Sequence, residues 1–232
     1  MYFIRLFGVN LHIQRFSYMI RLVIFDFDWT LGDTRRNIIL TMQQTLSRLG
    51  YPVFDEDTIA ATIGLPLETG FAVLLPNLSP EEAALCATTY REIFEENRIL
   101  LVPKLFPRVK ETLSELHRRG YVLTVASSRS SRSLNGFLAD MDIASEISYV
   151  LGADNVAKAK PDPEPVLQTL RDLGFASEET LVVGDMPVDI LMGARAGAHT
   201  CAVTYGNASA ETLRTVKPDY LIDSISELLA IL

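Results

Sequence analysis

Residues 22–30 read Leu-Val-Ile-Phe-Asp-Phe-Asp-Trp-Thr, and this stretch decides the fold. It opens with an apolar run, rich in β-branched and aromatic side chains, that stops at two acids. Such a run is typical of a strand buried on both faces, as in a parallel sheet, and we expect the strand to span 20–27. Because residues two apart on a strand point the same way, Asp26 and Asp28 are expected to face one site.

Similar apolar runs recur along the chain and alternate with helical patterns. The runs lie at 122–126, 149–151, 181–183, 201–203 and 220–222. The helical patterns lie at 109–119, 133–141, 164–173 and 188–196. Strands and helices joined by short connections predict an α/β fold, a doubly wound, Rossmann-like parallel sheet.

The interval 34–103 breaks this alternation, since it holds no convincing strand. Apolar residues recur at a helical period over 36–49, and the sequence Ser-Pro-Glu-Glu is typical of the start of a helix at 80–98. Gly64–Leu65–Pro66 predicts a turn between helices. We therefore expect a core of 19–33 and 104–232, with an all-helical cap domain, 34–103, inserted after the first strand.

Composition excludes several classes of protein. The chain has 232 residues, of which 48% are hydrophobic and 22% charged, so disorder, a coiled coil and collagen are excluded. Its formal net charge of −8 argues against nucleic acid or a membrane surface as a partner. Two cysteines, Cys86 and Cys201, are too few for a disulfide scaffold and predict a cytoplasmic protein.

Polar side chains follow the predicted strands at one edge of the sheet. Asp26, Asp28 and Thr30 follow the first strand, and Ser127 and Ser128 end the second. Lys160 lies on a loop beyond the third strand, in Lys-Pro-Asp-Pro, and Asp185 and Asp189 end the fourth. In an open α/β sheet, ligands bind at the carboxyl ends of the strands. The sequence therefore predicts one site built from these side chains.

Four carboxylates at one edge would repel one another, and a hard divalent cation relieves that repulsion. Mg²⁺ prefers oxygen ligands and often shares them with phosphate, whereas zinc sites use the histidine and cysteine that this set lacks. A lysine and a hydroxyl beside the metal suit phosphoryl transfer. An aspartate can serve as the nucleophile and form an acyl phosphate.

These motifs, in this order, resemble the haloacid dehalogenase superfamily, and specifically its phosphoglycolate phosphatase-like branch with a helical cap. The likeness covers 19–232. It implies a Mg²⁺-dependent phosphomonoester hydrolase that acts on a small phosphorylated metabolite through an aspartyl-phosphate intermediate. Phosphoglycolate is the leading substrate under that resemblance.

The resemblance also implies a role for each candidate residue. Asp26 would be the nucleophile, and Asp28 the general acid and base. The phosphate-binding residues would be Thr30, Ser127, Ser128 and Lys160, of which Ser127 and Lys160 also belong to the catalytic set. The metal site would be formed by Asp26, Asp28 through its carbonyl, Asp185 and Asp189.

Several of these positions have simpler interpretations. Ser127 is also a candidate helix N-cap, and Asp189 a favourable acid at a helix start. Arg129 either assists anion binding or is an exposed loop residue. Lys217 also lies in a Lys-Pro-Asp string, but it precedes a strand and so belongs to the opposite edge. The turn at 64–66, followed by Glu68 and Thr69, either faces the site and selects the substrate or only joins two helices.

Two residues depart from the family pattern. The family commonly has Gly where Trp29 stands, and Ser or Thr where Met186 stands. Trp29 either narrows the pocket or packs outward. Neither change removes a charged catalytic group, so activity is expected.

Two alternative functions share these residues. A sugar-phosphate mutase of the β-phosphoglucomutase type would return the phosphoryl group to a sugar hydroxyl instead of water. A non-catalytic phosphoacceptor, such as a receiver domain, also combines carboxylates, a hydroxyl and a lysine at strand ends. Receivers are much shorter and lack a helical insert, which argues against the second alternative.

Residues 1–18 are expected to be an extension upstream of the folded chain, with Met19 as the better start. Polar residues interrupt the apolar centre that a signal peptide needs, and an amphipathic helix or a targeting segment is the alternative. Deleting 1–18 should therefore leave the catalytic rate essentially unchanged, as measured on the purified truncated protein. A large loss would show that the segment contributes to folding or to substrate closure.

Overall fold

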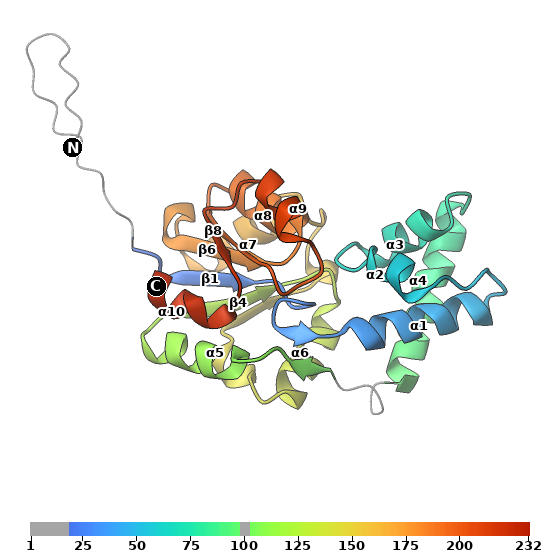
Figure 1. Ribbon diagram of the computed structural model, residues 1–232, viewed down its shortest axis with the longest axis horizontal. Coiled ribbons are helices and arrows are strands. Elements are labelled where there is room, and N and C mark those ends of the chain that lie inside the picture. Colours follow the sequence, from blue (N-terminus) through green and yellow to red (C-terminus); the bar gives the residue numbers. More distant parts are fainter. Residues whose placement is uncertain (1–18, 98–102) are drawn as a thin grey trace, which may run out of the picture.

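A computed structural model of the chain describes residues 19–97 and 103–232. A sheet-based core lies on one side of the molecule and a group of helices lies on the other (Figure 1). The interpretation of 1–18 as an extension, and the end of the expected helix at 80–98, lie outside the described residues.

The core is built on a six-stranded sheet with the order β5-β4-β1-β6-β7-β8, in which all neighbours are parallel. Its strands are β1 (Leu22–Phe25), β4 (Val122–Ala126), β5 (Tyr149–Leu151), β6 (Thr180–Gly184), β7 (His199–Val203) and β8 (Tyr220–Ile222). Strand β1 lies in the middle, with Leu22 opposite Val122 on one side and Thr180 on the other. The predicted doubly wound sheet is confirmed, although β1 is shorter than the expected 20–27.

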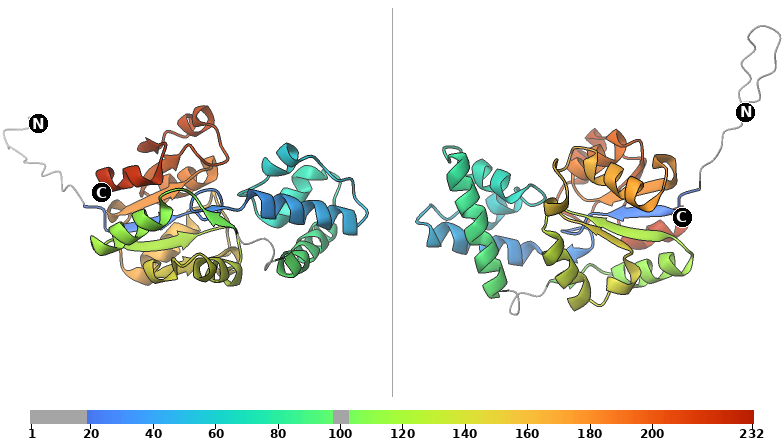
Figure 2. Two further views of the ribbon diagram at one scale, coloured as in Figure 1. Left: turned by 60° about the horizontal axis from the view of Figure 1, so that its bottom comes forward. Right: turned by 180° about the vertical axis from the view of Figure 1, so that it is seen from behind.

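Helices cover both faces of this sheet (Figure 2). They are α5 (Val109–Arg118), α6 (Ser131–Asp140), α7 (Glu164–Leu173), α8 (Pro187–Arg195), α9 (Ala210–Thr215) and α10 (Leu228–Ile231). Alternate residues of β1 face opposite layers: Val23 and Phe25 pack with α5 and α6, whereas Leu22 and Ile24 pack with α7 and α8. Burial on both faces explains why β1 has no polar residue.

The segment between the first strand and the rest of the core is helical in its described part. It holds α1 (Arg35–Arg48), α2 (Glu56–Ala60), α3 (Leu67–Leu74) and α4 (Pro80–Asn97). Helix α4 begins with a reciprocal cap, because the Ser79 side chain accepts from the Glu82 backbone and the Glu82 side chain accepts from the Ser79 backbone. We call these four helices the cap.

A short antiparallel pair joins the core and the cap, and the sequence did not reveal it. Strand β2 (Gly32–Asp33) precedes α1, and β3 (Lys104–Leu105) follows the cap. Each strand has only two residues, which is too short to show an alternating pattern. The chain passes between the core and the cap twice, and this pair places the two connecting segments side by side.

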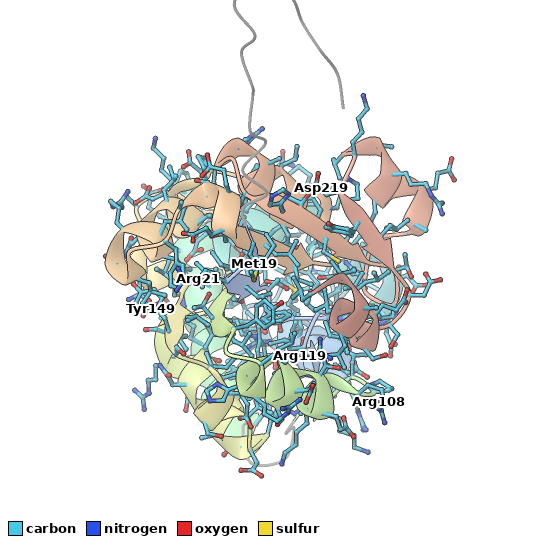
Figure 3. The ribbon with its side chains drawn as sticks, turned by 90° about the vertical axis from the view of Figure 1, so that its left-hand side faces the viewer. Met19, Arg21, Arg108, Arg119, Tyr149 and Asp219 are labelled. Carbon is cyan, nitrogen blue, oxygen red and sulfur yellow. The ribbon has the colours of Figure 1, made fainter. Side chains whose placement is uncertain are left out.

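The end of the core remote from the cap carries the amino ends of the strands (Figure 3). Met19 and Arg21 precede β1 there, and Asp219 precedes β8. Lys217 belongs to this end, as its position before a strand indicates. In the described residues, no helix is both long enough and apolar enough to cross a membrane.

Candidate active site

The carboxyl ends of the strands face the cap, and the predicted residues lie there (Figure 1). Asp26 follows β1, Ser127 follows β4, and Asp185 follows β6. Lys160 reaches the same place from the loop between β5 and α7, because its ammonium Nζ lies 2.6 Å from Asp26 Oδ1. Residues far apart in sequence are thus joined by direct contacts.

Lys160 holds two carboxylates together. Besides Asp26, its Nζ donates to Asp189 Oδ1 at 2.7 Å, and all three side chains are buried. The other Asp189 oxygen accepts from the backbone N–H of Met186 at 3.0 Å, at the start of α8. Asp189 therefore caps the start of α8, as one of its two interpretations expects, and it also binds Lys160.

Asp185 is fixed by two different segments of the core. The Thr30 hydroxyl donates to its Oδ1 at 3.1 Å, and the backbone N–H of Asn207 donates to its Oδ2 at 2.7 Å. The Thr30 hydroxyl, expected to bind phosphate, thus orients a carboxylate. Asn207 also donates from its side chain to the Ala60 carbonyl of the cap at 3.0 Å. Sequence reasoning missed Asn207, because a single asparagine in a loop gives no signal.

Two glycines make room for these acids. A Cβ on Gly184 would lie 2.4 Å from the Cβ of Asp189, and one on Gly206 would lie 2.1 Å from the Cβ of Asp185. Both distances are far below van der Waals contact, so any larger residue would displace the carboxylates. Glycine is therefore required at both positions for this arrangement of acids.

The three acids form a group that suits a metal ion. One oxygen each from Asp26, Asp185 and Asp189 lies within 4.8 Å of the other two. A set of carboxylate oxygens without histidine or sulfur fits a hard divalent cation. The donor chemistry at this position therefore agrees with a divalent metal site.

Burial and mutual repulsion shift the pKa values of the cluster. Burial raises the pKa of Asp26 to about 7; the Lys160 charge opposes this rise, and the charges of Asp189 and Asp28 add to it. Burial and the charges of Asp26 and Asp189 also raise the pKa of Asp185 well above its usual value. Burial lowers the pKa of Lys160, but the charges of Asp189 and Asp26 more than offset this, so Lys160 stays charged.

Asp28 is paired with Arg129 in the free protein. The Arg129 Nε lies 2.8 Å from both Asp28 oxygens, and Thr34 donates to Oδ1 at 2.6 Å. The guanidinium lies over the rings of Phe94 from the cap and Phe137 from the core, 5.3 and 4.9 Å from their centroids. Arg129 is therefore a buried residue that connects Asp28 with both parts of the molecule.

The two serines after β4 behave differently. Ser127 Oγ accepts from the backbone N–H of Arg129 at 3.3 Å, and its own proton stays available to a ligand in the cavity that it lines. Ser128 Oγ donates to the Gly64 carbonyl of the cap at 3.0 Å. Ser130, not Ser127, caps α6, which begins two residues earlier than expected.

Trp29 occupies a position that favours glycine. Its φ is +64°, in the left-handed region. Its backbone N–H donates to the carbonyl of Gly32 within the turn that follows β1. The side chain is buried, and Arg35 lies over its ring. Trp29 is not among the residues that line the cavity beside Asp26, so it packs outward instead of narrowing that cavity.

A cavity of about 630 Å³ lies between the core and the cap. Asp26, Asp28 and Ser127 line its core side, and the turn at 64–66 lines its cap side. Of the two interpretations of that turn, the structure supports the one that faces the site. The cavity gives a ligand access to Asp26, whose Oδ2 accepts no hydrogen bond from another described residue.

Comparison with known proteins agrees with this geometry. The family described as haloacid dehalogenase-like hydrolase matches residues 23–203, which include every predicted site residue. The chain belongs to the haloacid dehalogenase-like hydrolases. The predicted family is thereby confirmed over most of the chain.

Individual relatives place this haloacid dehalogenase-like hydrolase among the phosphatases of the family. "Probable phosphatase IndB" of Dickeya dadantii is 38% identical, over 89% of this chain and 90% of its own. A phosphoglycolate phosphatase of Vibrio cholerae is 32% identical, over 91% and 96%. Pyrophosphatase PpaX of Anoxybacillus flavithermus is 33% identical, over 92% and 97%. The hydrolase is therefore an enzyme of the phosphatase branch.

A solved structure supports the same assignment. A haloacid dehalogenase-like hydrolase from Bacteroides fragilis superposes with a TM-score of 0.85 at 29% identity. The match covers 90% of this hydrolase and 99% of that chain. The core and the cap therefore occur together in that relative.

The raised pKa of Asp26 leads to a prediction about metal and stability. In the metal-free fold Asp26 keeps its proton up to about pH 7, whereas in the unfolded chain it loses that proton near pH 3.8. The stability of the metal-free fold therefore falls as the pH rises from 3.8 to about 7. Mg²⁺ needs the ionised oxygens, so its stabilising effect should grow over the same range. We expect saturating Mg²⁺ to raise the midpoint of thermal unfolding by several degrees at about pH 8 and by much less at about pH 5.

The control for this measurement is Asp185→Asn, which removes one of the three acids expected to bind the metal and should lose most of the Mg²⁺ effect at both pH values. EDTA defines the metal-free midpoint. An equal shift at both pH values in the unaltered protein would contradict the prediction.

Proposed function

We propose that the protein is a Mg²⁺-dependent phosphomonoesterase that acts through a phosphorylated Asp26. The observation that carries the proposal is the contact of Lys160 with both Asp26 and Asp189, at 2.6 and 2.7 Å, beside a third acid, Asp185. A lysine and a divalent cation around one carboxylate suit a trianionic transition state. When bound, Mg²⁺ supplies positive charge to the phosphoryl oxygens and to Asp26.

In the first step, the open Oδ2 of Asp26 attacks phosphorus while the bond from phosphorus to the leaving oxygen breaks. The Ser127 hydroxyl and the Lys160 ammonium bind the phosphoryl oxygens. Asp28 has to leave Arg129 and take up a proton from solvent before this step, and it then gives that proton to the leaving alkoxide, which is a poor leaving group without one. Asp28 and Asp26 line the same cavity, so one ester can reach both side chains.

In the second step, water hydrolyses the acyl phosphate. Asp28 takes a proton from the water as its oxygen attacks phosphorus, and the bond from phosphorus to Asp26 breaks. The products are free Asp26 and inorganic phosphate. The cap covers the cavity and limits the access of bulk water to the intermediate.

The substrate and location are part of the proposal. A small phosphorylated metabolite fits the site, with phosphoglycolate suggested by the names of some relatives. Another relative at similar identity is named a pyrophosphatase, so the substrate has to be identified by assay. Cys86 and Cys201 are buried and unpaired, which supports a reducing location such as the cytoplasm.

A panel of phosphorylated metabolites, assayed with Mg²⁺ and with chelator, tests the function. We expect inorganic phosphate to be released with Mg²⁺ and not with excess EDTA. Product analysis with a hexose 1-phosphate separates the mutase, because that enzyme would yield the isomeric ester. Stable phosphorylation of the protein without turnover would point to a phosphoacceptor instead.

A further inference from the structure

The cavity beside Asp26 is larger than a two-carbon phosphate ester needs. Its volume of about 630 Å³ lies in the range of about 300–1,000 Å³ that is typical of pockets for drug-sized ligands. Asp26 and Ser127 occupy one end, where the phosphoryl group would bind. The remaining space extends toward the cap and is available to the alcohol part of the substrate.

The cap side of this space is mainly apolar. Ile38 and Met42 reach it from α1, and Ile63, Leu65 and Leu67 reach it from the turn and the start of α3. Leu65 and Leu67 are half-buried and still contact water in the open cavity, whereas Ile38, Met42 and Ile63 are already almost fully buried. A ligand that buries an apolar face against Leu65 and Leu67 gains the free energy of removing that surface from water.

Two residues that line the cavity carry a hydroxyl without a partner among the described residues. Tyr90 is only 5% exposed, and its hydroxyl makes no hydrogen bond to another described residue. Burial raises the pKa of Tyr90 to about 12, so this hydroxyl is a neutral donor. The Ser133 hydroxyl is also unpaired, but its oxygen is buried away from the open cavity, so it is not a contact for the ligand. The Tyr90 hydroxyl stays open to the cavity, where it would suit a hydroxyl or carbonyl group of a ligand.

The charges on the wall are already paired. Arg129 binds Asp28, and Arg91 binds Glu68 at 3.0 Å. Among the described residues that line the cavity, Arg132 is the only cation outside such a pair, and it is exposed. A carboxylate on a short alcohol would therefore meet no buried, unpaired cation beyond the phosphoryl end.

From this geometry we propose that the substrate is a phosphate monoester of an uncharged, nucleoside-sized alcohol with hydroxyls and an apolar ring. The phosphoryl group binds at Asp26, a hydroxyl pairs with Tyr90, and the ring lies against the apolar wall at Leu65 and Leu67. This inference rests on the proposed phosphomonoesterase function and names the class of its substrate. It differs from phosphoglycolate in both size and charge.

The test compares three phosphate esters of primary alcohols, so that the leaving groups are chemically alike. They are uridine 5′-monophosphate, ribose 5-phosphate and 2-phosphoglycolate. We expect kcat/KM to be highest for the nucleotide, roughly tenfold lower for the ribose ester, and lower again for phosphoglycolate. Equal or better turnover of phosphoglycolate would overturn the inference, and so would a ribose ester that matches the nucleotide.

A substitution in the apolar wall sharpens the test. Leu65→Trp fills the space for the ring, so the ratio of kcat/KM for the nucleotide to that for the ribose ester should fall roughly tenfold. The matched control is Val73→Trp, because Val73 is exposed on α3 and does not line the cavity. It should leave the ratio unchanged. A ratio that Leu65→Trp does not move would contradict binding of the ring at this wall.

Failure of this inference is distinguishable from failure of the proposed function. Hydrolysis of p-nitrophenyl phosphate reports on Asp26 and does not depend on the choice among the three esters. If Asp26→Asn abolishes that hydrolysis while phosphoglycolate is preferred, the function stands and the substrate class is wrong. If the protein shows no hydrolysis that depends on Asp26, both proposals fail.

Discussion

Asp26→Asn should abolish phosphatase activity, with a loss on the order of 10⁴-fold or more in kcat. An amide oxygen is not a competent nucleophile for phosphorus. Among the described residues, no second carboxylate takes the place of Asp26, which contacts Lys160 and lines the cavity. The measurement is phosphate release from p-nitrophenyl phosphate with saturating Mg²⁺. Retained turnover would remove Asp26 from the role of nucleophile.

The same substitution should leave the fold intact. Burial raises the pKa of Asp26 to about 7, so the neutral carboxylic acid is already favoured below that pH in the metal-free protein. Asparagine has nearly the same shape and still offers an oxygen to Lys160. We therefore expect a metal-free unfolding midpoint at about pH 8 no lower than that of the unaltered protein. Asp140→Asn, an exposed change on α6, is the control for activity.

The fold was predictable because its evidence is local. The run at 22–25 shows burial on both faces, and the later strands of the sheet repeat that local signal. The family profile confirms the assignment over 23–203. Strand β2, by contrast, exists only through pairing with β3, and that pairing joins residues more than 70 positions apart.

The site was predictable in its acids and lysine, because each follows a strand end and strand ends meet. The surroundings of Arg129 were not predictable. Its neighbours in sequence are serines, which suggest an exposed loop, yet it is buried because Phe94 and Phe137 cover it from two helices. Asn207 depends in the same way on non-local contacts with Asp185 and Ala60. Contacts between core and cap join residues far apart in the chain, so the local pattern of apolar and polar residues does not predict them.

Lys160→Met should cause the second large effect, on stability and on activity together. Lys160 is 8% exposed and lies between two carboxylates, so its loss leaves buried negative charges without their cation. Removing one partner of a buried ion pair typically costs about 3–5 kcal/mol. We expect a clearly lower unfolding midpoint without metal, and a loss of about 10²–10³-fold in kcat because the phosphoryl group loses a charged donor.

Mg²⁺ separates the two effects of Lys160→Met, because the ion neutralises the acids but cannot replace the ammonium at the phosphoryl oxygens. Stability should therefore recover with Mg²⁺ while kcat stays low. The matched control is Lys158→Met, since Lys158 is exposed and lies 3.8 Å from the Asp162 carboxylate. That surface pair should contribute well under 1 kcal/mol, so both readouts should stay unchanged. Recovery of kcat with Mg²⁺ in Lys160→Met would show that Lys160 only balances charge and does not bind the phosphoryl group.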